Sequence, residues 1–454
     1  MAESSWRSRS TREVKDLCRK YTFTNYRSQG GWDPRAVIVG GEGAWMFDAE
    51  GKRILDFSAQ YMCVNAGHNH PKIVQAICDQ ANAHCYVDPR YATHPRAELG
   101  RLLDEVTPEN IVKFVICLSG SDANDHAHQI ARQYTGRNKF ITTYRSFHGS
   151  STSTSILTGE SRRWSMEPGI SGVVHVPAPY CYRCDFGLKP ETCNMRCAHY
   201  MEQVIAYEGA QNVAAIMVEG VIGANGILLP HREDYLTTIR EICDRNGILM
   251  IVDEVMSGFG RTGTWFAVDH WKVQPDIITM AKGLTGSQLP LGAVGVSQKI
   301  ADFFDTNTLW SGGTFTNHPV ACAAAIAAIN VYREDGLIEN SRIQGEHIAG
   351  RLQEMQRKHP CIGDLRGKGL FQFVELVKNR ETRESFSKDN GATNDTGKIG
   401  SLDKIFSERG INIKYHPLGF FITPPLCISR EDVDFALDTI DEVLTDVVDT
   451  WTDQ

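Results

Sequence analysis

The middle of this chain contains seven apolar runs of strand length, separated by amphipathic stretches. The runs are KFVICL, KFITTY, VVHV, AAIMVEG, GILMIVDEV, DIITMAKG and GAVGVS. Segments that are apolar on both faces are what a parallel sheet covered by helices requires. The pattern therefore predicts an α/β fold with a large, mostly parallel sheet.

The two ends of the chain have a different character, with short strand-like pieces between Gly and Asp turn signals. We predict that residues 1–60 and 331–454 form one small α+β domain, and that residues 61–330 form the large domain. Residues 71–106 have a helical pattern, and residues 318–332 are typical of a buried helix. A closing amphipathic helix is expected from Glu431.

Composition narrows the class of function. The 454 residues carry 47 basic and 55 acidic side chains, a net charge of −8 without a long basic run. We therefore expect no nucleic-acid or membrane partner, and a small-molecule ligand instead. The beginning of the sequence is polar and no stretch reaches the length of about 18 apolar residues that a membrane span needs, so we expect a cytoplasmic protein. Of the 13 cysteines, several lie in apolar patterns (Cys117, Cys243, Cys322) and are expected to be buried hydrophobic residues.

Polar residues that directly follow the apolar runs are candidates for a ligand site, because open α/β sheets bind ligands beyond the carboxyl ends of their strands. After the first run, Gly120 and Ser121 enter a helical pattern, where free backbone N–H groups favour a phosphate. After the second run, Phe147 and His148 lie in a turn. Taken alone, these motifs are more typical of an ordinary helix cap and a core aromatic.

Two further strand ends carry Asp253 and Lys282. A strand-end Asp is costly to bury unless it is paired, and a desolvated lysine becomes an amine nucleophile toward carbonyls. The two are 282 − 253 = 29 residues apart, about one strand–helix–strand step, so both can project into one crevice. A phosphate cradle, a stacking aromatic, an Asp and a Lys together are the set that holds pyridoxal phosphate.

At this point the sequence resembles a known family. The stretches SGSDAN, FHGS, DEVMSGFGRTG, PDIITMAKGL, GGTFTNHPVACAAA and LRGKGLF are similar to those of the class III, or ω-amino acid, aminotransferases. These are fold-type I pyridoxal-phosphate enzymes, and the resemblance extends from about residue 35 to residue 445.

The resemblance implies a role for each matching residue. Lys282 would bind the cofactor covalently and act as the base, and Asp253 would pair with the ring nitrogen. Glu219 would match the family's gating glutamate. The remaining cofactor contacts would come from Gly120, Ser121, Phe147, His148, Val255 and Thr314. Thr314 would reach the phosphate of the neighbouring subunit, which implies a homodimer with shared active sites, or a tetramer built from it.

The chain departs from relatives at three positions where arginines hold the substrate carboxylate. These positions are occupied by Ser150, His416 and Phe421. A sulfonate, with three acceptor oxygens, can instead be held by several neutral donors. We therefore expect Trp32, Tyr61, Ser150 and His416 to line the substrate pocket, with Arg163 as a candidate carboxylate ligand.

The overall pattern is most similar to the taurine aminotransferases that use 2-oxoglutarate. Transfer from taurine would give sulfoacetaldehyde and glutamate. The alternatives are a β-alanine or 4-aminobutyrate transaminase that uses pyruvate, and an aminomutase or decarboxylase of the same fold. A further alternative, a non-enzymatic metal-binding protein, is disfavoured by the intact Lys282 and Asp253.

A cluster of four cysteines remains outside this scheme. Cys181, Cys184, Cys193 and Cys197 fall within seventeen residues, which argues against chance. Zinc, an iron–sulfur cluster and metal-free thiols are all compatible with this spacing.

Overall fold

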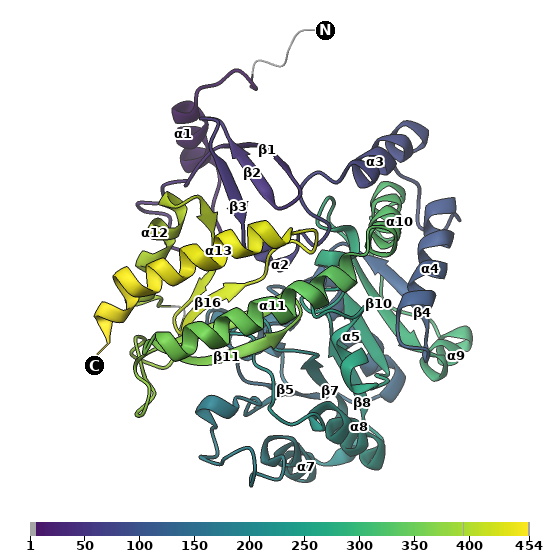
Figure 1. The fold of residues 1–454 in the computed structure, drawn as a ribbon. Coiled ribbons are helices and arrows are strands. Elements are labelled where there is room, and N and C mark those ends of the chain that lie inside the picture. The colour runs from purple at the N-terminus through teal and green to yellow at the C-terminus, as the bar shows by residue number, and fades with distance from the viewer. Residues whose placement is uncertain (1–5, 394, 453–454) are drawn as a thin grey trace.

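The computed structural model describes residues 6–393 and 395–452, and its central element is a seven-stranded sheet (Figure 1). Its strand order is β4-β10-β9-β8-β7-β5-β6. The strands are β4 (Ile111–Cys117), β5 (Lys139–Thr143), β6 (Val173–Val176), β7 (Val213–Glu219), β8 (Leu249–Asp253), β9 (Ile277–Met280) and β10 (Gly292–Ser297). Strands β7 to β10 are buried along their whole length. The predicted α/β sheet is thus confirmed.

One strand of this sheet runs against the others. β10 pairs antiparallel with both β4 and β9, whereas the pairs among β5 to β9 are parallel. An apolar run indicates that a strand is buried on both faces, but it does not indicate the direction in which the strand runs. The sequence therefore predicted the strand without its orientation.

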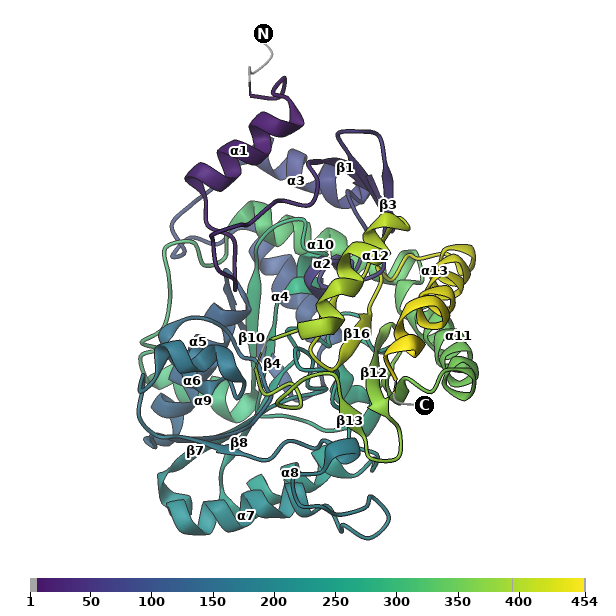
Figure 2. The same cartoon turned by 90° about the vertical axis from the view of Figure 1, so that its left-hand side faces the viewer.

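Helices cover this sheet and connect its strands (Figure 2). They are α3 (Pro71–Ala83), α4 (His94–Val106), α5 (Gly120–Thr135), α6 (Thr152–Leu157), α7 (Arg196–Glu208), α8 (Tyr235–Asn246), α9 (Gln298–Thr306) and α10 (Pro319–Glu334). Residues 71–106, predicted as one helical stretch, form two helices, and α3 and α4 each begin with a proline in their first turn. Proline favours a helix start because its missing N–H is not needed there.

Two smaller sheets combine residues from both ends of the chain. The first has the order β1 (Ile38–Glu42), β2 (Trp45–Asp48), β3 (Arg53–Asp56) and β14 (Ile411–Asn412). The second contains β11 (Ile362–Lys368), β12 (Phe371–Asn379), β13 (Glu384–Ser385), β15 (Tyr415–His416) and β16 (Gly419–Ile422). Because β14 pairs in parallel with β3, the N-terminal strands are joined to the C-terminal part by backbone hydrogen bonds.

The remaining helices lie around these two sheets. They are α1 (Thr11–Tyr21), α2 (Ala59–Met62), α11 (Leu337–Lys358), α12 (Leu402–Glu408) and α13 (Arg430–Val443). Figure 1 shows α11 and α13 side by side over the second small sheet. Among the described residues, we find no helix with the length and apolar character that crossing a bilayer requires. The predicted domain limits at residues 60 and 330 stay a prediction.

Candidate active site

The polar residues at the strand ends converge at one edge of the large sheet. Glu219 ends β7, Asp253 ends β8, and the two are register partners in the parallel ladder. Asp253 is in turn the partner of Thr279 in β9, and Lys282 lies two residues beyond the end of that strand. The carboxyl ends of parallel strands meet at one edge, so the adjacency predicted for Asp253 and Lys282 follows from the topology.

Asp253 is a buried carboxylate that is held on both oxygens. Its Oδ2 lies 2.8 Å from His148 Nδ1 and accepts a hydrogen bond of 2.7 Å from Asn124 Nδ2. Its Oδ1 accepts a hydrogen bond of 2.9 Å from the Val255 N–H. Asn124 is fixed in turn by a hydrogen bond of 2.6 Å from the Thr279 hydroxyl. The charge is therefore positioned before any ligand arrives.

Lys282 lies in an unusual backbone conformation at the mouth of β9. Its φ of +44° is in the left-handed region that non-glycine residues rarely adopt, a feature that is concentrated at functional sites. Burial lowers the pKa of its amine, and the nearby Cys63, Asp253 and Glu219 oppose that effect. A lysine with a lowered pKa has a larger neutral, nucleophilic fraction.

The turn after β4 is the predicted phosphate cradle. α5 begins at Gly120, and the Ser119 hydroxyl caps it by accepting from the Asp122 N–H at 3.2 Å. A Cβ at Gly120 would lie 2.7 Å from a Val255 methyl group, so a larger residue cannot be accommodated without movement. The Ser121 hydroxyl accepts a hydrogen bond of 3.1 Å from the Ser150 N–H. A helix N-terminus with small residues suits a dianionic phosphate.

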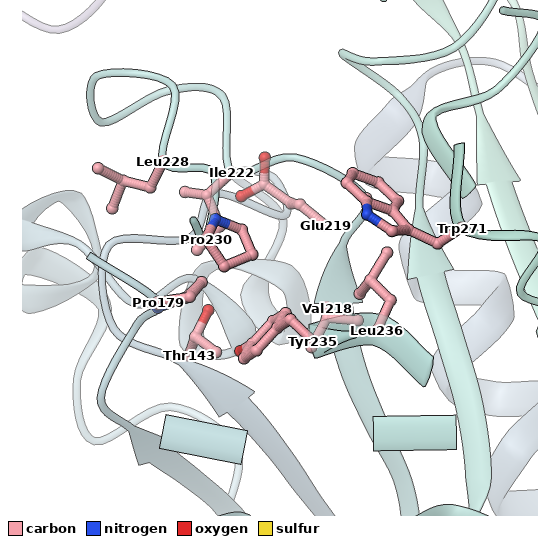
Figure 3. A pocket seen from close by; sticks show the side chains of 11 residues that line it. Thr143, Pro179, Val218, Glu219, Ile222, Leu228, Pro230, Tyr235, Leu236 and Trp271 are labelled. Atoms are coloured by element: carbon pink, nitrogen blue, oxygen red, sulfur yellow. The ribbon is translucent and has the colours of Figure 1, made fainter. Parts of the chain in front are cut away.

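Glu219 is buried at 6% exposure beside a small apolar cavity (Figure 3). Its Oε1 accepts from the Phe147 N–H at 2.9 Å and its Oε2 accepts from the Gly223 N–H at 2.8 Å. Burial raises the pKa of this carboxyl; His148 lowers it and Asp253 raises it further. Glu219 thereby fixes the backbone of Phe147, the aromatic residue predicted to stack on the cofactor.

The residues at this edge fit pyridoxal phosphate. The cradle would accept its phosphate, Asp253 would pair with a protonated ring nitrogen, and Lys282 would provide the amine that bonds to its aldehyde carbon. Phe147, His148 and Val255 lie around the same point, since His148 and Val255 both hydrogen-bond to Asp253. Asn124 was missed by the sequence analysis as a site residue, although it lies inside the SGSDAN motif.

Two of the predicted substrate residues are engaged within the chain. His416 is 4% exposed, its Nδ1 accepts from the Leu418 N–H at 3.2 Å, and its Nε2 lies 3.3 Å from Asn225 Oδ1. Burial and the surrounding cations lower its pKa to about 3. It is therefore neutral near pH 7, and neither ring nitrogen is free for a substrate. Arg163 donates to Glu167 at 2.9 Å and to the Gly159 carbonyl at 3.0 Å, so its guanidinium is also committed.

The other predicted substrate residues are more open. Tyr61 is 55% exposed, and Trp32 lies half-buried in the segment that follows α1. Ser150 and Phe147 line a cavity of about 410 Å³ together with Arg162.

Two cations near the site were missed by the sequence analysis. The Arg162 guanidinium lies 3.9 Å from the centre of the Phe147 ring. Lys414 Nζ lies 3.8 Å from the centre of the Tyr61 ring. Burial lowers the pKa of Lys414 to about 7, and the positive charges of Lys282 and Arg162 add to this effect. Lys414 is two residues from His416, and Arg162 is next to the predicted Arg163, which lines the same cavity.

The four clustered cysteines line a second, small cavity with Phe186 and Leu188. Within residues 6–393 and 395–452, the three potential metal ligands whose ligand atoms lie within 4.8 Å of one another are Cys117, Asp122 and His126. None of the four clustered cysteines belongs to this group. The structure therefore gives no support for a metal at Cys181, Cys184, Cys193 and Cys197.

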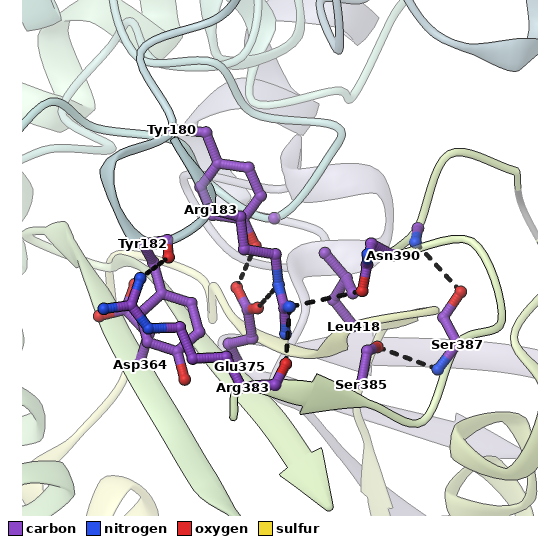
Figure 4. A network of polar contacts seen from close by, with 12 residues as sticks. Tyr180, Tyr182, Arg183, Asp364, Glu375, Arg383, Ser385, Ser387, Asn390 and Leu418 are labelled. Carbon is purple, nitrogen blue, oxygen red and sulfur yellow. Dashed lines mark hydrogen bonds and ion pairs between the residues drawn. The ribbon is translucent and has the colours of Figure 1, made fainter. Parts of the chain in front are cut away.

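This cysteine segment is tied to the second small sheet by a buried polar network (Figure 4). Arg183 donates to Glu375 Oε1 at 2.7 Å, and the Tyr180 hydroxyl donates to Glu375 Oε2. Arg366 also donates to Oε2, at 2.6 Å. Glu375 itself is fully buried in β12.

Thr314 lies on an exposed loop outside its own chain's phosphate cradle. Its carbonyl accepts a hydrogen bond of 2.9 Å from the Tyr86 hydroxyl. The Tyr86 and Phe315 rings pack edge to face, with centroids 5.7 Å apart. The exposed Trp310 belongs to the same loop.

The chain is similar to known proteins over most of its length. The profile of the family described as aminotransferase class-III matches residues 27–444. Among solved structures, a taurine:2-oxoglutarate aminotransferase from Bifidobacterium kashiwanohense is similar with a TM-score of 0.93 and 36% identity, covering 97% of this chain and 99% of that one.

Two curated relatives show the range of chemistry among similar chains. A leucine/methionine racemase of Thermococcus litoralis is 36% identical, with 90% of this chain and 91% of that protein covered. A taurine–pyruvate aminotransferase of Bilophila wadsworthia is 32% identical, with 96% and 97% covered.

Proposed function

Because the chain belongs to the class III aminotransferases, which are pyridoxal-phosphate enzymes, we propose that it transfers the terminal amino group of a small ω-amino acid or ω-aminosulfonate to a 2-oxo acid. Taurine is the favoured donor and 2-oxoglutarate the favoured acceptor. The products are then sulfoacetaldehyde and glutamate. The observation that carries the donor class is the pair of cations formed by Arg162 on the Phe147 ring and Lys414 on the Tyr61 ring.

The chain's own residues have defined tasks in this reaction. Pyridoxal phosphate, when bound, supplies the electron sink that makes the carbon bearing the amino group acidic. The Asp253 carboxylate keeps the ring nitrogen protonated, since a fixed negative charge stabilises the positive one. Lys282 Nζ takes the proton from the donor's amine-bearing carbon, and its lowered pKa makes this amine a competent base.

The anionic end of the donor would be held by Arg162 and Lys414. Arg162 lies above Phe147 and pairs through Nε with Glu160, so its terminal nitrogens would bind the anion, and Lys414 places an ammonium above Tyr61. Two separate cations suit a tetrahedral sulfonate, which presents three oxygens in different directions. Similarity to the taurine aminotransferases of Bifidobacterium kashiwanohense and Bilophila wadsworthia supports this choice of donor.

A donor screen tests the proposal. The purified holoenzyme is assayed with taurine, β-alanine and 4-aminobutyrate, each with 2-oxoglutarate and with pyruvate. We expect the highest kcat/KM for taurine with 2-oxoglutarate. A kcat/KM for taurine well below those of both carboxylates contradicts the sulfonate assignment.

A carboxylate donor is the second candidate, because Arg162 and Lys414 would also bind a carboxylate. In the same screen, a β-alanine or 4-aminobutyrate transaminase would have its highest kcat/KM for one of these two donors with pyruvate. Omitting the 2-oxo acid separates these from a mutase, decarboxylase or racemase of the same fold. A transaminase stops after one amino group per site, whereas the others continue to turn over.

We further propose that the active unit is a homodimer. Thr314 lies on an exposed loop whose surroundings include the apolar side chains of Tyr86, Trp310 and Phe315. Contiguous exposed apolar side chains of this size mark an interaction surface. A second copy of the chain would cover them and bring Thr314 to the partner's phosphate cradle.

A further inference from the structure

Three potential metal ligands converge beside the phosphate cradle. Cys117 ends β4, Asp122 lies in the first turn of α5, and His126 lies one turn further on. Their Sγ, carboxylate oxygen and imidazole nitrogen all lie within 4.8 Å of one another. Asp122 and His126 are four residues apart and so share one face of the helix.

One ring nitrogen of His126 is hydrogen-bonded and the other is available to bind a metal. Its side chain is only 5% exposed, and its Nδ1 is hydrogen-bonded to the Ser311 hydroxyl. Its Nε2 is buried without a hydrogen-bond partner within residues 6–393 and 395–452, and lies 3.6 Å from Asp122 Oδ1. An unsatisfied buried nitrogen is costly. A histidine with one ring nitrogen held by a hydrogen bond and the other free is the usual arrangement at a metal site.

The other two groups also present free ligand atoms. Asp122 Oδ2 accepts from the Leu118 N–H at 2.9 Å, which leaves Oδ1 directed to His126. Cys117 Sγ makes a long contact of 3.8 Å to the Ser119 carbonyl and also interacts with the Asp122 carboxylate. Burial and the Asp122 charge raise the pKa of this thiol, so without a cation it is protonated and neutral.

We propose that Cys117, Asp122 and His126 bind a zinc ion. A thiolate, an imidazole and a carboxylate are the donor types that Zn²⁺ takes, whereas Mg²⁺ and Ca²⁺ prefer oxygen alone. In a tetrahedral zinc site with ordinary bond lengths, the ligand atoms lie about 3.3–3.8 Å from one another. The three side chains therefore move slightly closer together when zinc binds. The thiol proton passes to solvent, and a water completes the coordination from the partly exposed side of Asp122, whose side chain is 36% exposed.

The position of the site defines its role. Gly120 and Ser121 of the phosphate cradle lie between Cys117 and Asp122 in the chain, and Ser311 belongs to the loop that carries Thr314. A zinc ion there would join the end of β4, the first turn of α5 and this loop. The ion therefore stabilises the cradle, and it is not among the groups that act on the substrate at Lys282.

Metal analysis of the holoenzyme tests the site. Protein stripped with a chelator and then equilibrated with Zn²⁺ should retain about one zinc per chain and gain in Tm, because a ligand that binds only the folded state stabilises it. His126→Asn keeps a polar atom for Ser311 but removes Nε2, and it should lose both effects. Cys117→Ser gives an independent second variant if His126→Asn folds poorly.

The cysteine cluster provides the matched control. Cys184→Ser should retain the zinc, and Co²⁺ in place of Zn²⁺ should give the visible ligand-field bands of a tetrahedral site in the wild type but not in Cys117→Ser. The proposal is overturned if wild-type protein retains no zinc. It is equally overturned if His126→Asn and Cys117→Ser retain it, or if Cys184→Ser loses it, which would place the metal at the cysteine cluster.

Discussion

At the scale of single residues, the site is built from groups whose position is fixed before a ligand binds. Asp253 is held by His148, Asn124 and the Val255 N–H. Replacing it with Asn keeps the volume but removes the charge that stabilises the protonated ring nitrogen. We expect Asp253→Asn to lower kcat by roughly 10²–10³-fold, as for loss of one preorganised electrostatic group. Near-normal turnover with full cofactor content would exclude this role.

Lys282 is expected to be the lysine that bonds to the cofactor. Borohydride reduction of the holoenzyme, followed by peptide mass mapping, should place the label on the peptide that contains Lys282. Lys414 is the internal control, because it also lies near the site with a lowered pKa. A label on Lys414 or any other lysine would refute the assignment.

The pKa of about 7 at Lys414 predicts a pH dependence. The ammonium is charged below this pH and neutral above it, so the KM for an anionic donor should rise as the pH increases through 7. Lys414→Arg keeps its charge throughout and should flatten this dependence. Lys414→Met should raise the KM for taurine by about tenfold or more at pH 6, since a hydrogen bond to a charged group contributes about 1.5–3 kcal/mol.

An uncharged amine donor is the control for Lys414. Its KM should be the same in the wild type and in Lys414→Met. If Lys414→Met affects both donors equally, Lys414 supports the fold of the pocket rather than binding the anion.

The sequence located Lys282 and Asp253 because each follows a recognisable apolar strand. It did not locate Arg162 and Lys414. Arg162 lies in a 3₁₀ turn (Ser161–Met166) and Lys414 in the short link between β14 and β15, where no periodic pattern tells which way a side chain points.

At the scale of elements, the buried Glu375 of β12 is the anchor for the segment that carries the first two clustered cysteines. It binds Arg183 and the Tyr180 hydroxyl from that segment, and Arg366 from β11. Glu375→Gln removes the charge partner of the largely buried Arg183 and one of the two charge partners of Arg366, which also pairs with Asp364. We expect a loss of about 3–5 kcal/mol in the free energy of unfolding, measured by denaturant titration.

Glu339→Gln is the matched control for Glu375→Gln. Glu339 also binds an arginine, Arg342, but on the exposed surface of α11. Exposed pairs contribute about 0–1 kcal/mol. Equal effects of the two substitutions would show that the buried network does not anchor the segment.

The strands of the large sheet were predictable because burial on both faces leaves a continuous apolar run. The direction of β10 was not, since direction depends on how the chain returns to the sheet. The break between α3 and α4 was also not predicted. The apolar residues before residue 83 and those after residue 94 follow the same helical period, so they were interpreted as one helical stretch. Pro95, in the first turn of α4, was the local signal for a new helix start.

At the scale of the whole molecule, a shared active site predicts complementation between subunits. Lys282→Ala lacks the cofactor lysine and Thr314→Ala lacks the proposed phosphate contact. A mixed dimer of the two has one site with both residues intact. Unfolding and refolding the two variants together should therefore restore activity above that of either one alone.

The same experiment has an inactive control. Lys282→Ala refolded with a Lys282→Ala, Thr314→Ala double variant contains no intact site and should stay inactive. A monomeric mass in light scattering, or no restored activity in the first mixture, would contradict the shared site.

The pairing of β3 with β14 has a consequence for synthesis on the ribosome. Asp56 and Asn412 are hydrogen-bonded across a separation of 356 residues, and Asp56 is fully buried in the finished fold. Until residue 412 leaves the exit tunnel, the edge of β3 and this carboxylate have no partner from the C-terminal part. We therefore expect nascent chains to bind chaperones at β3 until translation is almost complete, and chains released before residue 412 to be degraded rather than to accumulate as partly active enzyme.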